Sequence, residues 1–403
     1  MANVSSSNGL EKLPKLRFPG FDEPYRKCRI GDVYAERSQR GAGDMELLSV
    51  TINEGVMPRS EIEGKDNSSE DKSNYKVVYK GDMVYNSMRM WQGANGVSTY
   101  DGIVSPAYTV LMPTEEIDNQ YFAALFKTSN LINEFRKNSQ GLTSDTWNLK
   151  YPQIRGIRLY TPSLQEQHKI SSFIGALEER IGKQRQLVDA LKKYKRGLIS
   201  DILKQNLAVS HESEKWEEVS LNDVADGFEY GMNAAATTFD GAHKYIRITD
   251  IDDDSHTYID CDPVSPSGVL EEKYRVRDND ILFARTGASV GKSYLYRKTD
   301  GDLFFAGFLI RIHVKDGIDS EYVFLNTLTE EYAKWVLLES ARSGQPGINA
   351  EQYRRYRFKL PSLRIQKRIA SIAQKLDSQI QRESMCLHLL QEQKLGLLQQ
   401  LFI

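Results

Sequence analysis

The sequence has few cysteines and no long hydrophobic run. Its three cysteines, Cys28, Cys261 and Cys386, are far apart and odd in number, unlike the even, closely spaced set of a disulfide-stabilised secreted domain. No run of about 18 apolar residues is present, so no membrane-spanning helix is expected. The first residues, MANVSSSNGLEKL, lack the apolar core of a signal peptide. These absences predict a cytoplasmic protein with free thiols and no membrane contact.

The residue patterns of the common catalytic and metal sites are also missing. The six histidines show neither H-x-x-x-H spacing nor a neighbouring C-x-x-C pair, so nothing indicates a metal site. No G-x-G-x-x-G run is present, nor the Asn/Asp-Pro-Pro-aromatic run of a methyltransferase. No nucleophile stands beside a candidate base. We therefore expect no catalytic residue, no metal and no cofactor.

Two segments resemble known ligand sites but differ from them in a decisive feature. TGASVGKS at 286–293 nearly matches the phosphate-binding loop G-x-x-x-x-G-K-[ST], but Thr286 replaces the first glycine. The residues that follow, SYLYRK, alternate like a strand and do not open a helix. The acidic cluster at 250–254 lacks the glycine and distal glutamate of a calcium loop. We interpret the first segment as a glycine-rich turn and the second as a solvated loop.

One long segment occurs twice in the chain. Residues 162–204 read PSLQEQHKISSFIGALEERIGKQRQLVDALKKYKRGLISDILK, and 361–403 read PSLRIQKRIASIAQKLDSQIQRESMCLHLLQEQKLGLLQQLFI. The two copies align without a gap. In both, apolar residues recur at alternating spacings of four and three, which is typical of the a and d positions of a coiled coil.

We expect the two helices to pack on each other, because a seam of this length is unfavourable when exposed. A globular segment separates the copies, so an antiparallel pairing is the simplest geometry. The predicted scaffold seam includes Ile170, Leu177, Ile181, Leu191, Leu198, Ile369, Leu376, Ile380, Leu390 and Leu397.

Two seam positions are polar in both copies, Gln184 with Glu383 and Lys195 with Lys394. Such residues either fix the register of a coiled coil or face a partner subunit. In an antiparallel pair, the numbers of facing residues add to one constant, and the possible constants step by seven. A constant of 578 places Lys195 by Glu383 and Lys394 by Gln184. Constants of 571 or 564 give a longer overlap, and the sequence does not choose between them.

The globular segments that precede each long helix form a second, looser repeat. KGDMVYNSMRMW resembles DNDILFARTGAS, and SQGLTSDTWN before the first long helix mirrors RSGQPGINAE before the second. Within the first segment the pattern predicts a strand pair around Gly81-Asp82, a strand at 104–113 and helical structure at 117–138. RGIRLYTP reads as a last strand, and 321–341 again has a helical pattern.

The order of globule, helix, globule, helix predicts an α/β fold made by tandem duplication with a pseudo-twofold. Two α/β domains would alternate with two long helices that form an antiparallel coiled coil. The predicted boundaries are a disordered tail at 1–15, globular domains at 16–161 and 206–360, and long helices at 162–205 and 361–403.

This plan resembles the specificity subunit of a Type I restriction–modification system. The opening LRFPGF, the turn GDMVYN with its counterpart NDILFAR, and the PSLxxQ start of each long helix carry the resemblance from about residue 16 onward. It implies two target-recognition domains, each reading half of a bipartite site on double-stranded DNA. It also implies that the helix pair fixes the spacer and docks two methyltransferase subunits, that restriction (translocase and endonuclease) subunits join the complex, and that this subunit has no catalytic role. Because the two globules differ, we expect an asymmetric target.

The candidate DNA contacts are polar side chains in the loops that follow GDMVYN and NDILFAR and in the loops before each long helix. Base readout favours Arg or Lys for guanine and Asn or Gln for adenine. The alternative for any one of these residues is a solvated loop position, and for the two tryptophans a place in the core. The predicted contacts are Asn86, Ser87, Arg89, Trp91, Gln92, Thr143, Trp147, Lys150, Arg285, Thr286, Ser289, Lys292, Arg342, Ser343, Gln345 and Asn349.

The net charge of −2 gives no overall signal for nucleic acid, although phosphate contacts drive much of DNA affinity. We therefore expect partner subunits to supply much of the phosphate neutralisation. Two other functions stay open on the sequence. One is a coiled-coil adaptor that joins proteins without touching DNA, and the other is an ATPase built on the segment 286–293.

Overall fold

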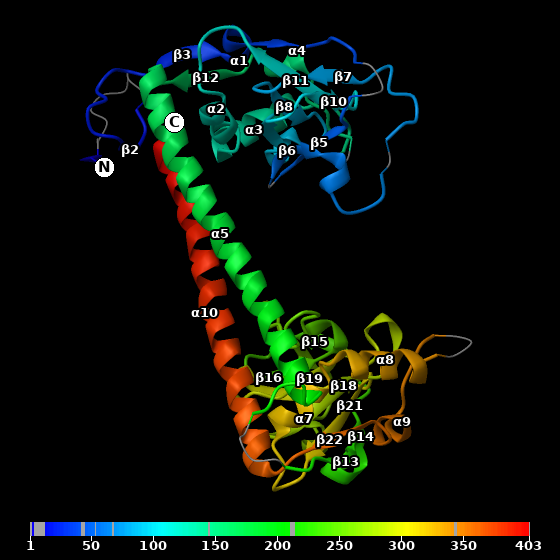
Figure 1. The fold of residues 1–403 in the computed structure, drawn as a ribbon. Helices are drawn as coiled ribbons and strands as arrows, with labels where there is room; N and C mark the ends of the chain where they lie inside the picture. Colours follow the sequence, from blue (N-terminus) through cyan, green and yellow to red (C-terminus); the bar gives the residue numbers. More distant parts are fainter. Residues whose placement is uncertain are drawn as a thin grey trace. The chain divides into compact units, whose positions relative to one another are not determined.

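The structure is a computed structural model that describes residues 2–3, 13–41, 45–52, 54–66, 68–143, 146–209, 214–341 and 345–402. The chain forms two compact units, the first made of Met1–Gln186 with Ser384–Ile403 and the second of Leu187–Glu383. Each unit therefore contains one globular part and one half of each long helix. These helices are α5 (Leu164–Leu203) and α10 (Leu363–Leu401) (Figure 1).

The first unit is built around a four-stranded antiparallel sheet with the strand order β4-β11-β8-β9. Its strands are β4 (Tyr34–Glu36), β8 (Met83–Asn86), β9 (Asn95–Val97) and β11 (Tyr108–Pro113). Two-stranded pairs surround it: β1 (Ala2–Asn3) with β2 (Leu16–Arg17), β3 (Arg26–Arg29) with β12 (Arg158–Thr161), β5 (Leu48–Thr51) with β6 (Gly55–Pro58), and β7 (Lys76–Val78) with β10 (Gly102–Val104). The helices of this part are α1 (Ile30–Val33), α2 (Asn119–Leu125), α3 (Ser129–Asn138) and α4 (Tyr151–Ile154).

The second unit repeats this plan, with the sheet order β14-β21-β18-β19. These strands are β14 (Ala225–Tyr230), β18 (Asp280–Ala284), β19 (Ser293–Leu295) and β21 (Leu309–Val314). Its smaller pairs are β13 (Glu217–Ser220) with β22 (Arg357–Leu360), β15 (Ala236–Thr238) with β17 (Val264–Pro266), and the parallel pair β16 (His243–Ile246) with β20 (Asp302–Phe305). Its helices are α6 (Leu221–Val224), α7 (Ser320–Asn326), α8 (Glu330–Glu339) and α9 (Ala350–Arg354). The repeated strand order confirms the predicted duplication of α/β domains.

One local prediction was wrong. The strands on either side of Gly81-Asp82 do not pair with each other, because β7 pairs with β10, whereas β8 pairs with β11 and β9. Gly81 has a φ of +95°, and the Asp82 carboxylate accepts the Tyr79 N–H and pairs with Arg37. These contacts fix a turn that carries the chain from one sheet to another. The predicted strand at 104–113 is likewise divided between β10 and β11.

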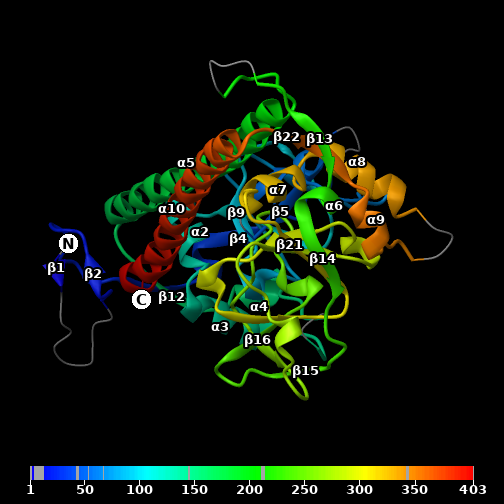
Figure 2. The same cartoon turned by 90° about the horizontal axis from the view of Figure 1, so that it is seen from below.

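The long helices belong to the hydrophobic core of each unit. In the first unit Ile170 and Ile174 of α5 and Leu398 and Leu401 of α10 share one buried cluster with α2. In the second unit the opposite halves do the same, with Ile199 and Ile202 of α5 beside the first turns of α10. The start of one helix therefore lies beside the end of the other in both units, so the helices run antiparallel (Figures 1 and 2).

The predicted seam positions lie on the inner side of the helix pair. Ile170, Ile181, Ile369 and Leu390 are buried. The others are half-buried: Leu177, Leu191, Leu198, Leu376, Ile380 and Leu397.

Two ion pairs identify the register. Lys394 pairs with Glu178 at 2.6 Å in the first unit, and Lys195 pairs with Asp377 at 2.5 Å in the second. In both pairs the residue numbers add to 572. This sum differs by only one from the candidate constant of 571. The register with a constant of 578 is thereby excluded, since it would place Lys195 beside Glu383.

The glutamine of each PSLxxQ motif joins a long helix to its globular part. The Gln167 carbonyl oxygen accepts the N–H of Asp118 at 3.0 Å, and its amide donates to the Pro162 carbonyl at 3.0 Å. Gln366 accepts from Asp319 at 2.9 Å and donates to Pro361 at 2.8 Å.

Asp118 and Asp319 are themselves the N-caps of α2 and α7. Gln167 and Gln366 are 3% and 2% exposed, so neither bond can be replaced by solvent without disrupting the packing.

We predict that Gln366→Met destabilises the protein by about 1–3 kcal/mol, because a side chain of similar size leaves the part-buried Asp319 N–H and the buried Pro361 carbonyl without their partners. The midpoint of urea unfolding measures this change. Gln400→Met, at an exposed position of the same helix, is the matched control and should leave the midpoint nearly unchanged. An equal effect of both substitutions would contradict the role given to Gln366.

We also predict that Lys195→Glu destabilises the protein by a few tenths to about 1 kcal/mol, because it places a like charge beside Asp377. Adding Asp377→Lys should restore most of the lost stability, as read from a double-mutant cycle of unfolding free energies. Lys193→Glu, an exposed neighbour with the same charge change, serves as control. Rescue by Glu383→Lys in place of Asp377→Lys would show that the other register is populated.

Candidate nucleic-acid interface

Two loops of the first unit are joined by their backbones. The Ser87 N–H, just after β8, donates to the Ala107 carbonyl at 3.0 Å. The Ser87 carbonyl accepts the N–H of Leu149 at 2.8 Å, which lies in the loop before α4. The loop after β8 and the loop before the first long helix therefore form one continuous surface.

Two tryptophans fill the junction between these loops. The rings of Trp91 and Trp147 meet edge to face with centroids 5.3 Å apart, and the Trp91 indole N–H donates to the Met88 carbonyl at 3.0 Å. The guanidinium carbon of Arg136, at the end of α3, lies 5.9 Å from the centroid of the Trp91 ring. Both tryptophans are half-buried. They lock the loops together and still present part of each ring to solvent.

The second unit joins its corresponding loops in the same way. The Arg285 N–H, just after β18, donates to the Phe308 carbonyl at 3.0 Å, and the Arg285 carbonyl accepts the N–H of Ile348 at 2.9 Å. The Gly287 N–H also donates to the Pro346 carbonyl at 3.1 Å. Arg285 and Ile348 thus take the places of Ser87 and Leu149. The loops that carry the polar residues singled out by the sequence are thus joined by backbone hydrogen bonds in each unit.

Several predicted contact residues already have internal partners. Ser87 is 3% exposed and its hydroxyl lies 2.9 Å from that of Thr109. The side chain of Lys292 is 10% exposed, donates to the Ile251 carbonyl at 3.0 Å and pairs with Asp253. The Asn349 side chain caps α9 by accepting the Gln352 N–H at 2.9 Å, and that of Asn86 accepts the Met88 N–H at 3.0 Å. These bonds hold the loops in shape, although Asn86 is half-buried and Asn349 is exposed.

Of the other predicted contact residues, those that the structure describes reach the surface. Arg342 and Ser343 lie outside the described residues. Arg89, Thr143, Lys150 and Gln345 are exposed, while Gln92, Arg285, Thr286 and Ser289 are half-buried.

Three neighbours of these loops were missed by the sequence reasoning. Tyr230, at the end of β14, places its ring 4.9 Å from the Arg285 guanidinium carbon. Phe308 is 61% exposed beside the same arginine backbone, and Arg136 faces Trp91. No motif marks them, because each comes from a segment distant in sequence.

The segment that resembles a phosphate-binding loop has a packing role. It connects β18 to β19 through the short 3-10 helix Gly287–Ser289, so the predicted strand follows it and no α-helix presents its N-terminus. Gly291 has a φ of +87° and a Cβ there would lie 2.6 Å from Val336. Lys292 is held by Ile251 and Asp253. This geometry does not fit a nucleotide phosphate.

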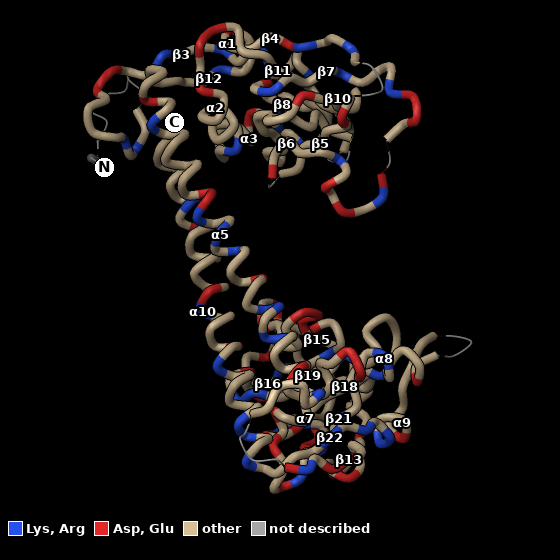
Figure 3. The backbone as a smooth tube through the Cα atoms, viewed as in Figure 1, with Lys and Arg blue, Asp and Glu red and all other residues tan. Residues whose placement is uncertain are grey.

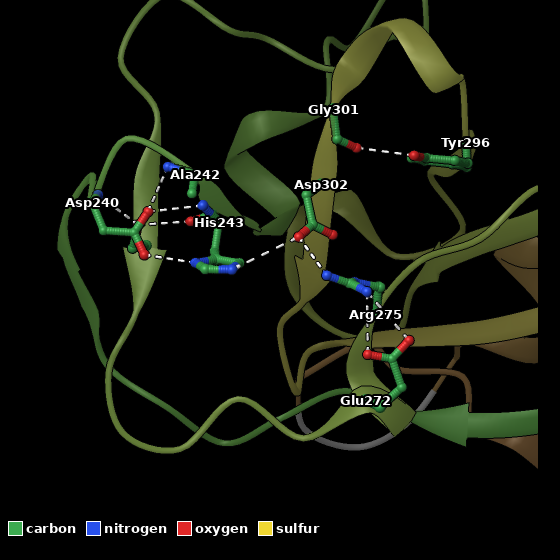
Figure 4. Close-up of polar contacts among 9 residues, drawn as sticks. Asp240, Ala242, His243, Glu272, Arg275, Tyr296, Gly301 and Asp302 are labelled. Carbon is green, nitrogen blue, oxygen red and sulfur yellow. Dashed lines mark hydrogen bonds and ion pairs between the residues drawn. The ribbon is translucent and has the colours of Figure 1, made fainter.

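A chain of ionisable side chains crosses the β16 and β20 region of the second unit (Figure 4). Asp240 lies 2.8 Å from Nδ1 of His243, whose Nε2 lies 3.9 Å from Asp302. Asp302 in turn pairs with Arg275 at 2.8 Å, and Arg275 pairs with Glu272 at 3.3 Å.

Hydrogen bonds from the His243 backbone and side chain hold the pKa of Asp240 well below its usual range. Because each charge in this chain is paired and no nucleophile stands among them, we interpret it as structural. Within the described ranges, no group of three or more His, Cys, Asp or Glu residues is arranged to hold a metal ion.

Charges of both signs are interspersed over each unit (Figure 3). The chain has a net charge of −2, and no single basic face stands out in this view. In the part of the chain that the structure describes, no helix combines the length and the apolar character needed to cross a membrane. Cys28, Cys261 and Cys386 are free thiols.

A comparison with curated proteins found no match, but two other comparisons did. The family described as Type I restriction modification DNA specificity domain matches residues 25–193 and again 213–385. A chain from a structure on complex assembly and conformational transition of the type I R-M system is similar, with a TM-score of 0.59 and 16% identity over 95% of this chain and 98% of that one. The S subunit of a Type-I restriction-modification system from M. genitalium gives a TM-score of 0.58 at 14% identity, covering 97% and 99%. These structural likenesses show a shared fold, and the double family match shows that the chain belongs to the Type I restriction–modification DNA specificity family, with two copies of its recognition domain.

Proposed function

We propose that this chain is the non-catalytic subunit that selects the target of a cytoplasmic Type I restriction–modification complex. Each unit reads one half of a bipartite site on double-stranded DNA. The observation that carries the proposal is the joint between the two polar loops, which the Leu149–Ser87 and Ile348–Arg285 backbone bonds build alike in both units. Both units share this backbone connection, but the side chains around it differ. This is the arrangement expected of two recognition domains that have the same fold and bind different half-sites.

The target is asymmetric in this proposal, because the two surfaces differ in chemistry. The first unit offers the Trp91–Trp147 pair with Arg89 and Lys150, and the second offers Arg285, Thr286 and Gln345. Hydrogen-bonding side chains of these kinds discriminate base pairs in the major groove. The internally bonded residues, such as Ser87 and Lys292, position the loops without touching bases.

Two methyltransferase subunits dock on the helices in this proposal, and restriction subunits join that assembly. Each unit leaves apolar side chains exposed on its half of the helix pair. Met385 and Leu389, one turn apart on α10, are 57% and 56% exposed in the first unit. Leu187 and Tyr194, two turns apart on α5, are 43% and 58% exposed in the second. These two patches, one on each long helix, are the docking sites proposed for the two partners.

We predict that the chain alone binds DNA weakly and that its complex with methyltransferase subunits binds tightly, because a protein of net charge −2 neutralises few phosphates. Mobility shifts with random duplex pools, followed by sequencing of the bound fraction, measure affinity and motif together. Tight sequence-specific binding by the isolated chain would contradict this prediction. If the complex enriches no motif at all, the adaptor function is favoured.

A second prediction concerns assembly. Replacing Met385 and Leu389 with glutamine should reduce the number of bound methyltransferase subunits from two to one. Replacing Leu187 and Tyr194 with glutamine should likewise remove one subunit, the one bound at the other patch. All four substitutions together should abolish binding, as read by native mass spectrometry.

The matched control is glutamine at Leu337 and Leu338, which are 73% and 79% exposed on α8 and belong to neither long helix. This control should leave the assembly intact. Full occupancy by two methyltransferase subunits after all four helix substitutions would exclude these patches as docking sites.

A further inference from the structure

Arg285 differs from the other arginines around it. Among the described residues of the second unit outside the two long helices, it alone lacks a carboxylate partner. The paired arginines are Arg247, Arg275, Arg277, Arg297, Arg311, Arg354, Arg355 and Arg357. An arginine that is half-buried yet lacks an anionic partner keeps its donors available for a ligand.

The guanidinium of Arg285 is held by an aromatic ring and not by an anion. Its carbon lies 4.9 Å from the centroid of the Tyr230 ring. Contact with a ring face stabilises the cation while leaving the N–H groups in the guanidinium plane able to donate elsewhere.

The Tyr230 ring is itself fixed. Tyr230 pairs with Ile310 in the central sheet, and its hydroxyl accepts the N–H of Ala350 at 3.2 Å. The backbone of Arg285 is held on both sides by Phe308 and Ile348. Little conformational freedom is therefore lost when this side chain meets a target.

We propose that Arg285, positioned by Tyr230, reads a guanine in the half-site of the second unit. The inference rests on the proposed function. The fork of a guanidinium matches the N7 and O6 acceptors of guanine, and no other base presents two acceptors there. The corresponding residue of the first unit is the buried Ser87, so this contact is confined to one half-site. Tyr230 acts as a positioning residue, since it orients the arginine without touching the base.

The test uses the whole complex of this chain with its methyltransferase subunits, expressed in cells whose methylated sites are then mapped. The unaltered chain should give a bipartite motif with a guanine in one half. Arg285→Ala should make that one position degenerate and leave the other half unchanged. On duplexes differing only at this base pair, the preference for guanine should fall by roughly 5- to 150-fold in methylation rate.

Two further variants separate positioning from folding. Tyr230→Phe keeps the ring and should keep the motif, whereas Tyr230→Leu removes the ring and should relax the same single position. Arg285→Lys keeps the charge without the fork, so it should also relax that position while retaining the fold. Arg277→Ala removes an exposed arginine that pairs with Glu272, and it should change nothing in the motif.

The outcomes distinguish this inference from the function on which it rests. A uniform drop in methylation with an unchanged motif would mean that Arg285 contacts phosphate, and it would overturn the guanine assignment. Loss of discrimination at a base other than guanine would also overturn the guanine assignment. An unchanged motif in the Tyr230→Leu variant would overturn the positioning role of the tyrosine. If the unaltered complex methylates no bipartite motif, the proposed function itself fails.

Discussion

Two buried glutamines fix how each recognition domain is attached to the helices. Gln167 and Gln366 each bridge the first turn of a long helix to the N-cap residue of α2 or α7. The same amide also closes the turn at Pro162 or Pro361. Because the two glutamine side chains are almost fully buried, the angle between helix and domain is set by hydrogen bonds that are largely shielded from water. A reader attached in this way does not pivot freely on its scaffold.

The hydrophobic packing reinforces this attachment. Ile170 and Ile174 pack in the core of the first unit, and Ile199 and Ile202 in that of the second. Each helix therefore takes part in two cores, one at each end. The ends of the helices are thus part of the domain cores, so the scaffold is not a coiled coil separate from the domains.

Much of this architecture could be predicted from the sequence, because repetition and periodicity are visible without tertiary information. The gapless repeat gave the two helices, and the alternating spacing gave their inner face. The register stayed open, since a pattern of a and d positions repeats every seven residues. The register was decided by the ion pairs Lys195–Asp377 and Lys394–Glu178. No sequence pattern marks Asp377 or Glu178 as the partners of these lysines. The false strand pair around Gly81 arose because alternation predicts strands but not their partners, which here come from β10 and β11. The role of Tyr230 was invisible for the same reason.

The joint between the recognition loops consists of main-chain atoms. Leu149 donates to Ser87, and Ile348 donates to Arg285, through amide groups that every residue except proline possesses. Substitution of the neighbouring side chains leaves this joint intact. Under the proposed function, a domain of this design can therefore change its base preference one amino acid at a time without rebuilding its backbone frame.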